Sequence, residues 1–335
     1  MAMGPGAIGQ FFSMPEEERQ ACLDCHAPLS EQFDALTQYL DDSQWRESDH
    51  PAIARLKRPL HGEGVTCGAC HIRAGRWYGP PRRRVPLSPE IMALFPHHGW
   101  ISTEAFQDSR FCAACHQFPP DGPRLDGKLI EDTYREWRES PQARQGMSCQ
   151  TCHMPDRHHL FRGIHDPATV RKGVEVGSKS FSLSEGKISV LVFLANTGTG
   201  HRLPTYVTPE IRLEAYQSDA NGASIPNTEQ VRRVARSVSI DLTEEYFDTR
   251  LAPGQTATLA YQKSLSPCAD TLVTRVYVEP DALYARIYEA LLELEPEGEG
   301  SVLIRKALAE SRASGFPIHE KHYPIPKDSH VRPES

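Results

Sequence analysis

Eight of the nine cysteines in this 335-residue chain fall into four pairs of one spacing, each followed directly by a histidine. The four motifs are Cys22, Cys25 and His26; Cys67, Cys70 and His71; Cys112, Cys115 and His116; and Cys149, Cys152 and His153. In a Cys-x-x-Cys-His motif the two thiols add to the vinyl groups of a haem, and the histidine binds its iron from one side. The sequence therefore predicts four covalently attached c-type haems, with these four histidines as the proximal ligands.

Cysteine pairs of this spacing also occur in four-cysteine zinc sites and in redox-active dithiols. Neither of these sites needs a histidine directly after every second cysteine, and a disulfide framework would not repeat one spacing four times. Haem attachment is therefore favoured over all three alternatives. The ninth cysteine, Cys268, lies far from the motifs and is predicted to be a small buried or loop residue.

Each iron either takes a sixth ligand or keeps an open position, and this difference separates an electron carrier from a catalyst. Of the 15 histidines, four belong to the motifs, so eleven remain, and bis-histidine ligation is the default expectation. Sequence context favours histidines close to the motifs or in glycine-rich segments. These candidates are His61, one of His97 and His98, His158, His159, His165 and His201.

Charge and hydropathy narrow the class of protein. The net charge of −7 argues against nucleic-acid binding, which needs clustered Lys and Arg. No stretch of 18 or more apolar residues exists, so no membrane span is predicted. The N-terminus lacks the basic and long apolar regions of an export signal. Because c-type cytochromes are exported before haem attachment, we expect an extracellular or periplasmic protein whose export signal is not part of this sequence.

The residue pattern changes near residue 170, which predicts two domains and an α+β fold. Residues 1–170 read as a loop-rich, haem-packed domain with short helices, one of them at 131–140 before Pro141. Residues 171–335 are predicted to form a small β-sandwich-like domain with C-terminal helices and a polar tail. The strands are expected within 187–195, 212–217, 251–261 (after a turn) and 271–278, and the helices at 280–292 and 301–314.

The chain resembles the multihaem c-type cytochromes that pair a tetrahaem domain with a β-rich C-terminal domain. The resemblance is carried by the motifs, the segments 137–141 and 146–155, the loop 196–205 and the turn 251–254. It implies proximal roles for the four motif histidines, and distal roles for His61, His98, His165 and His201. The chain departs from the family at Gln142, where members often carry a further histidine.

A narrower resemblance is to tetrahaem protomers of extracellular cytochrome filaments, in which a histidine of one subunit can bind a haem of the next. We therefore expect electron transfer rather than enzymatic activity, with other redox proteins or identical subunits as partners. One alternative is a multihaem reductase in which one open haem acts on a small nitrogen or sulfur compound. Others are a soluble periplasmic electron carrier, and a β-rich domain that binds a partner or surface while the haems supply electrons.

Overall fold

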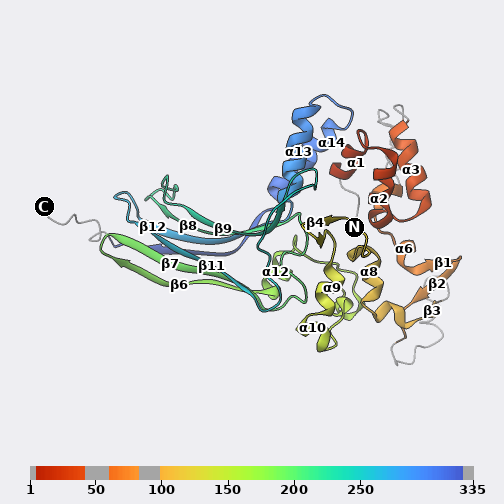
Figure 1. Ribbon diagram of the computed structural model, residues 1–335, viewed down its shortest axis with the longest axis horizontal. Helices are drawn as coiled ribbons and strands as arrows, with labels where there is room; N and C mark the ends of the chain where they lie inside the picture. The colour runs from red at the N-terminus through yellow and green to blue at the C-terminus, as the bar shows by residue number, and fades with distance from the viewer. Residues whose placement is uncertain (1–4, 42–59, 83–98, 327–335) are drawn as a thin grey trace. The chain divides into compact units, whose positions relative to one another are not determined.

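The computed structural model describes residues 5–41, 60–82 and 99–326, and the chain divides into two compact units. One unit comprises Met1–Cys115 and Tyr288–Ala309, and the other comprises His116–Ile287 and Glu310–Ser335. The predicted α+β class is confirmed, with short helices in the N-terminal part and strands followed by helices in the C-terminal part (Figure 1). The four motifs lie before residue 170, and the strands of the larger sheets lie after it. The domain boundary near residue 170 stays a prediction.

The first unit begins with three helices around a small apolar cluster. They are α1 (Pro5–Phe11), α2 (Glu16–His26) and α3 (Ser30–Asp41). Leu23 and Ala27 lie four positions apart, so they share one face of the chain and are buried with Phe11 and Leu36. This packing fixes the last turn of α2, where the first cysteine pair lies.

The rest of the first unit consists of short elements around the second and third motifs. They are η1 (Leu60–Glu63), α6 (Cys67–His71), the strands β1 (Ile72–Arg73), β2 (Arg76–Gly79) and β3 (Ile101–Ser102), η3 (Glu104–Gln107) and α8 (Arg110–His116). The three strands form one small sheet in the order β1-β2-β3.

The second unit opens with a hairpin and four short helices. These are β4 (Arg124–Leu125) with β5 (Lys128–Leu129), then α9 (Thr133–Arg138), α10 (Pro141–Arg144), α11 (Cys149–His153) and α12 (Pro167–Gly173), with the turn η4 (Pro155–Arg157) before α12. The helix predicted at 131–140 corresponds to α9. Pro141 starts a new helix at once, because Ser140 caps α10 by accepting a hydrogen bond from the Ala143 amide at 3.2 Å.

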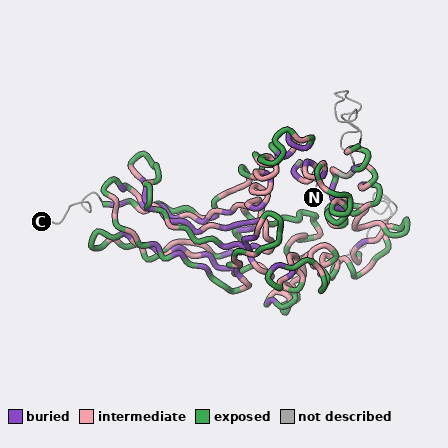
Figure 2. The backbone as a smooth tube through the Cα atoms, turned by 45° about the horizontal axis from the view of Figure 1, so that its top comes forward, coloured by how far each residue is buried: buried purple, intermediate pink, exposed green. Residues whose placement is uncertain are grey.

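Two antiparallel sheets form the sandwich in the second unit (Figure 1). The larger has the order β10-β9-β8-β12-β13 and the smaller β11-β7-β6. Their bounds are β6 Val174–Ser184, β7 Lys187–Asn196, β8 Glu210–Ser218, β9 Gln230–Val238, β10 Glu245–Asp248, β11 Thr256–Ser264, β12 Thr271–Glu279 and β13 Phe316–Pro324. Alternate residues of β7 are buried against β8 and β12 residues such as Leu213 and Val276, as the buried stretches in Figure 2 illustrate.

The sequence analysis did not predict the strands β6, β9 and β10, and the chain after β12 departs from the expectation at one further point. The helices α13 (Ala282–Leu294) and α14 (Ser301–Ala313) form as predicted, but the residues after them are not a polar tail up to residue 324. They form the edge strand β13, antiparallel to β12. Prolines at its second and last positions, Pro317 and Pro324, obscure the strand pattern, although edge strands tolerate proline. Among the described helices, none is long and apolar enough to cross a membrane.

Candidate functional site

All four cysteine motifs lie at the C-terminal ends of helices. These helices are α2, α6, α8 and α11, and each ends at the motif histidine. Residues three apart on a helix are neighbours on one face, so both sulfurs of a pair lie on the same side. All nine cysteines lie in the described ranges, and none is joined in a disulfide; Cys268 is an exposed residue of a turn.

Two motif histidines are held by backbone carbonyls through Nδ1. His71 donates from Nδ1 to the carbonyl of Tyr78 at 2.7 Å, and His153 donates from Nδ1 to the carbonyl of Arg162 at 2.9 Å. A carbonyl only accepts, so the proton must be on Nδ1 and the lone pair on Nε2. Histidines that bind metal are usually oriented in this way. At His26, burial lowers the pKa, which favours the neutral imidazole that a metal requires.

His116 differs from these two because its Nδ1 faces a side chain. The hydroxyl of Tyr206 lies 2.7 Å from this nitrogen, and the two ring centroids are 6.1 Å apart. Unlike a carbonyl, a hydroxyl can accept a proton from Nδ1 and donate its own proton elsewhere. His116 is therefore connected to a further polar side chain of its own unit.

The loop that carries His201 is fixed by side chains on both of its flanks. Asn196 Nδ2 and Thr199 Oγ1 donate to the carbonyl of His201 at 2.9 and 2.8 Å. On the other side, the amide of Arg202 donates to Glu136 Oε2 at 2.9 Å. A Cβ at Gly200 would lie 3.1 Å from the ring of Trp137, so a glycine allows this close approach. The His201 side chain is thus held against the helices that lead to the fourth motif.

The rings of His153 and His201 lie close to each other in nearly parallel planes. Their ring centroids are 6.3 Å apart and their planes are inclined by 15°. With iron–nitrogen bonds of about 2 Å, two imidazoles on opposite sides of one iron place their centroids roughly 6 Å apart. His201 also donates from Nδ1 to the carbonyl of Arg202 at 2.9 Å, so its lone pair is on Nε2, and burial lowers its pKa to about 4. The two residues therefore fit a haem iron as an axial pair.

Gln142 lies beside this pair. Its Cβ is within 3.2 Å of a Cβ built at Gly200, directly before His201 in the chain. Gln142 Oε1 is buried and has no hydrogen-bond partner among the described residues. A buried amide oxygen without a partner is costly in an ordinary protein interior, so it marks a place where a group beyond the chain is expected.

Of the other three predicted distal ligands, only His165 has a side chain that the structure describes. His98 lies outside the described residues, and so does the side chain of His61, whose backbone belongs to η1. His165 lies in the second unit, where its Nε2 is 3.0 Å from Asp281 Oδ1 and its side chain is 61% exposed. This ion pair does not favour ligation of iron by His165, and the three distal roles stay predictions.

The His165–Asp281 pair predicts a pH-dependent contribution to stability. The hydrogen bond that His165 donates to Asp281 raises the pKa of His165. Burial acts to raise the pKa of Asp281, but the hydrogen bonds from His165 and Ser314 outweigh it and lower this pKa. The pair should stabilise the fold fully between pH 3.8, the ordinary pKa of Asp281, and pH 6.5, the ordinary pKa of His165. The contribution should be lost as the pH rises through the raised pKa of His165, or as it falls through the lowered pKa of Asp281. His165→Gln should lower the free energy of unfolding by less than about 1 kcal/mol in this window. Urea unfolding across pH measures it.

The same variant also tests the ligand role of His165. We expect the absorption spectrum of the haem-loaded protein to be unchanged in His165→Gln, because the ring is paired with a carboxylate. Appearance of a high-spin haem would instead assign His165 to an iron. A stability difference that persisted unchanged above about pH 9 would contradict the ionic origin of the contact.

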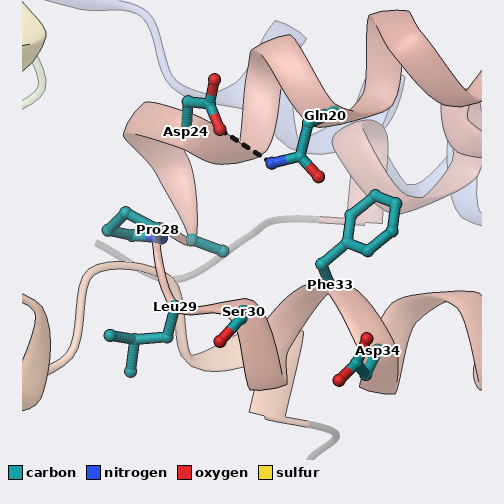
Figure 3. A pocket seen from close by; sticks show the side chains of 8 residues that line it. Gln20, Asp24, Pro28, Leu29, Ser30, Phe33 and Asp34 are labelled. Atoms are coloured by element: carbon teal, nitrogen blue, oxygen red, sulfur yellow. Dashed lines mark hydrogen bonds between the residues drawn. The ribbon is translucent and has the colours of Figure 1, made fainter.

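A cavity of about 310 Å³ lies beside the first motif, between α2 and α3. Its walls are mainly polar, and Figure 3 shows the hydrogen bond of 2.7 Å from Gln20 Nε2 to Asp24 Oδ1. The lining residues are Gln20, Asp24, Ala27, Pro28, Leu29, Ser30, Phe33 and Asp34. Two carboxylates do not suit the face of an apolar ring, so we assign this cavity no part in haem binding.

Several residues that shape the site gave no signal in the sequence. Tyr206 contacts a motif histidine, Glu136 holds the amide of Arg202, and Asn196 holds the carbonyl of His201. Each contact joins segments that are distant in the chain or depends on a particular loop conformation. The only available sign was the glycine-rich loop 196–205 itself, which indicated a tight turn around His201.

Comparison with known proteins bears on the fold. The structure is similar to the penta-haem cytochrome c552 of Thermochromatium tepidum, with a TM-score of 0.57, 19% identity, and 91% of this chain and 84% of that one covered. The chain shares the fold of a solved multihaem c-type cytochrome. In sequence, it is 24% identical over 141 residues to cytochrome c-552 of Aliarcobacter butzleri (strain RM4018). That match spans 40% of this chain and 26% of the relative's length. No family model matches.

Proposed function

We propose that this chain transfers electrons through four c-type haems, each attached covalently at one Cys-x-x-Cys-His motif. The observation that carries the proposal is the fourfold repeat of one arrangement, a cysteine pair on the last turn of a helix that ends in the motif histidine. Haem c supplies a one-electron iron couple when bound. The chain's own residues hold the ring, fix its axis and set its potential.

The coordination we propose is bis-histidine. His26, His71, His116 and His153 are the proximal ligands, and His201 is the distal ligand opposite His153. The separation of 6.3 Å between the rings of His153 and His201 supports this pair. For the remaining irons, the resemblance to tetrahaem cytochromes supports His61, His98 and His165 as distal candidates, with His165 the least favoured because of its contact with Asp281.

At the fourth motif, the same pair favours electron transfer over reduction of a bound substrate. An iron with an imidazole on both sides has no position at which a small nitrogen or sulfur compound can bind. In the proposed role the chain works outside the cytoplasm, in the periplasm or at the cell exterior, and exchanges electrons with other redox proteins. The resemblance to filament protomers makes a second copy of this chain the first partner to test.

The haem content provides the direct test. Protein produced with an export signal in a host that matures c-type cytochromes should carry four covalent haems, measured by intact mass and by the pyridine haemochrome spectrum. A Cys67→Ala, Cys70→Ala variant should carry three, because its second motif cannot form thioether bonds. Cysteine pairs that remained unmodified, or that bound zinc in place of haem, would overturn the proposal.

Assembly is tested separately on the fully loaded protein. Electron micrographs over a wide concentration range should reveal polymers if identical subunits are the electron partners. Uniformly monomeric particles would remove the filament role and leave a carrier that passes electrons to other proteins.

A further inference from the structure

One loop of the sandwich contacts histidines of two cysteine motifs. The loop comprises residues 197–209, between β7 and β8. It carries His201, whose ring centroid lies 6.3 Å from that of His153. Five residues later it carries Tyr206, whose hydroxyl lies 2.7 Å from His116 Nδ1. The same loop is therefore in contact with the fourth motif and with the third.

The residues on both sides of Tyr206 are fixed by contacts of their own. Thr205 Oγ1 is hydrogen-bonded to Thr133 Oγ1 at 2.7 Å, and the carbonyl of Thr205 accepts a hydrogen bond from Arg250 Nη1 at 2.8 Å. On the other side, Val207 packs against a buried apolar cluster of the same unit. The backbone that carries Tyr206 is thus anchored independently of the contact with His116.

The role of His116 decides the direction of this hydrogen bond. If His116 binds an iron through Nε2, its Nδ1 carries the proton and donates it, so the hydroxyl of Tyr206 is the acceptor. The distance of 2.7 Å is within the usual range for such a bond. His71 and His153 donate from Nδ1 to backbone carbonyls instead. Among the motif histidines whose Nδ1 contact the structure describes, only His116 has a side chain as its acceptor.

An acceptor at Nδ1 changes what the histidine donates to a metal. It draws the Nδ1 proton outward, which makes the imidazole a stronger electron donor through Nε2. A more electron-rich ligand favours ferric over ferrous iron, so it lowers the reduction potential. A backbone carbonyl is present whatever the side chain is, whereas the acceptor of His116 can be removed by one substitution that leaves the ligand in place.

We propose that Tyr206 is a positioning residue that orients His116 and lowers the reduction potential of the haem at the third motif. This inference rests on the proposed function, because it requires a haem on His116. The loop between β7 and β8 then acts on two haems. It supplies the distal ligand of the fourth haem, and it supplies the hydrogen-bond acceptor for the proximal ligand of the third. The sandwich thereby contributes directly to the redox centres.

The test is a spectroelectrochemical redox titration of the haem-loaded protein and of its Tyr206→Phe variant at one pH. The variant keeps the ring of Tyr206 and the ligand His116, and it removes only the accepting oxygen. One of the four haem components should move to higher potential. We expect about a tenfold change in its ratio of ferric to ferrous haem at a given electrode potential, which is about 59 mV for a one-electron couple. The other three ratios should stay within about twofold of the wild type.

Two further variants identify the haem and control for the loss of a hydroxyl. A Cys112→Ala, Cys115→Ala variant should lack the third haem, so the component that moves should be missing from its titration. Adding Tyr206→Phe to that variant should move none of the three remaining components. Tyr246→Phe is the matched control, because Tyr246 lies on β10 of the same unit and is 58% exposed. It should leave all four components unchanged.

The Nδ1 proton of His116 provides a readout that a merely structural role would not move. In NMR spectra of the oxidised wild type, this proton should have a nuclear Overhauser contact with the ring of Tyr206 and should exchange slowly with water. In Tyr206→Phe the exchange should become faster, while the absorption spectrum stays low spin and the intact mass still corresponds to four haems. Absence of the Overhauser contact in the wild type would contradict the hydrogen bond itself.

The outcomes distinguish the two proposals. If mass analysis of the third-motif peptide finds no haem, the proposed function fails there and the inference about Tyr206 fails with it. If four haems are present but no component moves in Tyr206→Phe, or one moves to lower potential, the inference is wrong and the electron-transfer role stands. A shift that remains in the protein without the third haem would overturn the inference in the same way.

Discussion

Replacing His201 with alanine should convert one haem of the loaded protein from low spin to high spin while all four stay covalently attached. The reason is that the variant keeps the Cys149 and Cys152 thioether bonds and the proximal His153, and loses only the nitrogen on the opposite side. The hydrogen bonds from Asn196 and Thr199 use the carbonyl of His201, and the variant loses only the bond from the ring to the carbonyl of Arg202, so the loop should keep its conformation. Absorption spectra and EPR of the oxidised protein measure the change.

Two companion measurements identify the cause. Added imidazole should restore the low-spin spectrum of His201→Ala by occupying the vacated position. His201→Met should stay low spin and raise the potential of that haem, within the range of about 0.8 V that axial ligands span, because a thioether favours ferrous iron.

His322→Ala is the matched control for the loss of a histidine. This residue lies on β13, is 58% exposed and contacts Glu320, so its removal should leave the haem spectra unchanged. A fully low-spin spectrum for His201→Ala without added ligand would show that His201 does not bind the iron opposite His153.

Replacing Arg236 with alanine should produce the largest loss of stability, about 3–5 kcal/mol in the free energy of unfolding of the second unit. Arg236 is 1% exposed and lies on β9. Its Nε donates to Glu245 Oε2 at 2.9 Å, and its terminal nitrogens donate to the carbonyls of Leu125, Lys128 and Leu129 at 3.1, 3.2 and 2.6 Å. Truncation leaves these buried acceptors without that donor.

The effect should be concentrated in the hairpin of β4 and β5. The carbonyls that Arg236 holds belong to this hairpin, which directly precedes Glu131 and Thr133 in the chain. Urea unfolding gives the total change, and hydrogen exchange of the amides at 124–129 gives the local one. Arg232→Ala on the same strand is the control, because Arg232 is exposed and makes one bond, from Nη1 to the carbonyl of Thr258. Equal losses in both variants would contradict a special role for the buried guanidinium.

Four strands of the sandwich, β7, β8, β11 and β12, could be predicted because their signal is local, whereas β6, β9 and β10 were not predicted. Residues 187–195 alternate in burial along β7, and residues 271–278 match β12 to within one residue. The turn at 251–254 was also confirmed, with Gly254 at φ 83° and a hydrogen bond of 2.9 Å from the Gln255 amide to the Ala252 carbonyl. β13 was missed because two prolines interrupt its pattern, and only its pairing with β12 makes it a strand.

By itself, the sequence determined the four motifs at which haem attachment is proposed and the histidines proposed as proximal ligands. The two sulfurs and the imidazole of each motif lie within about one turn of helix, so local geometry is sufficient. The tertiary structure decided the rest, namely that His201 faces His153, that His165 pairs with Asp281, and that Tyr206 reaches His116. Each of these contacts joins segments far apart in the chain, and its existence depends on packing that no short motif encodes.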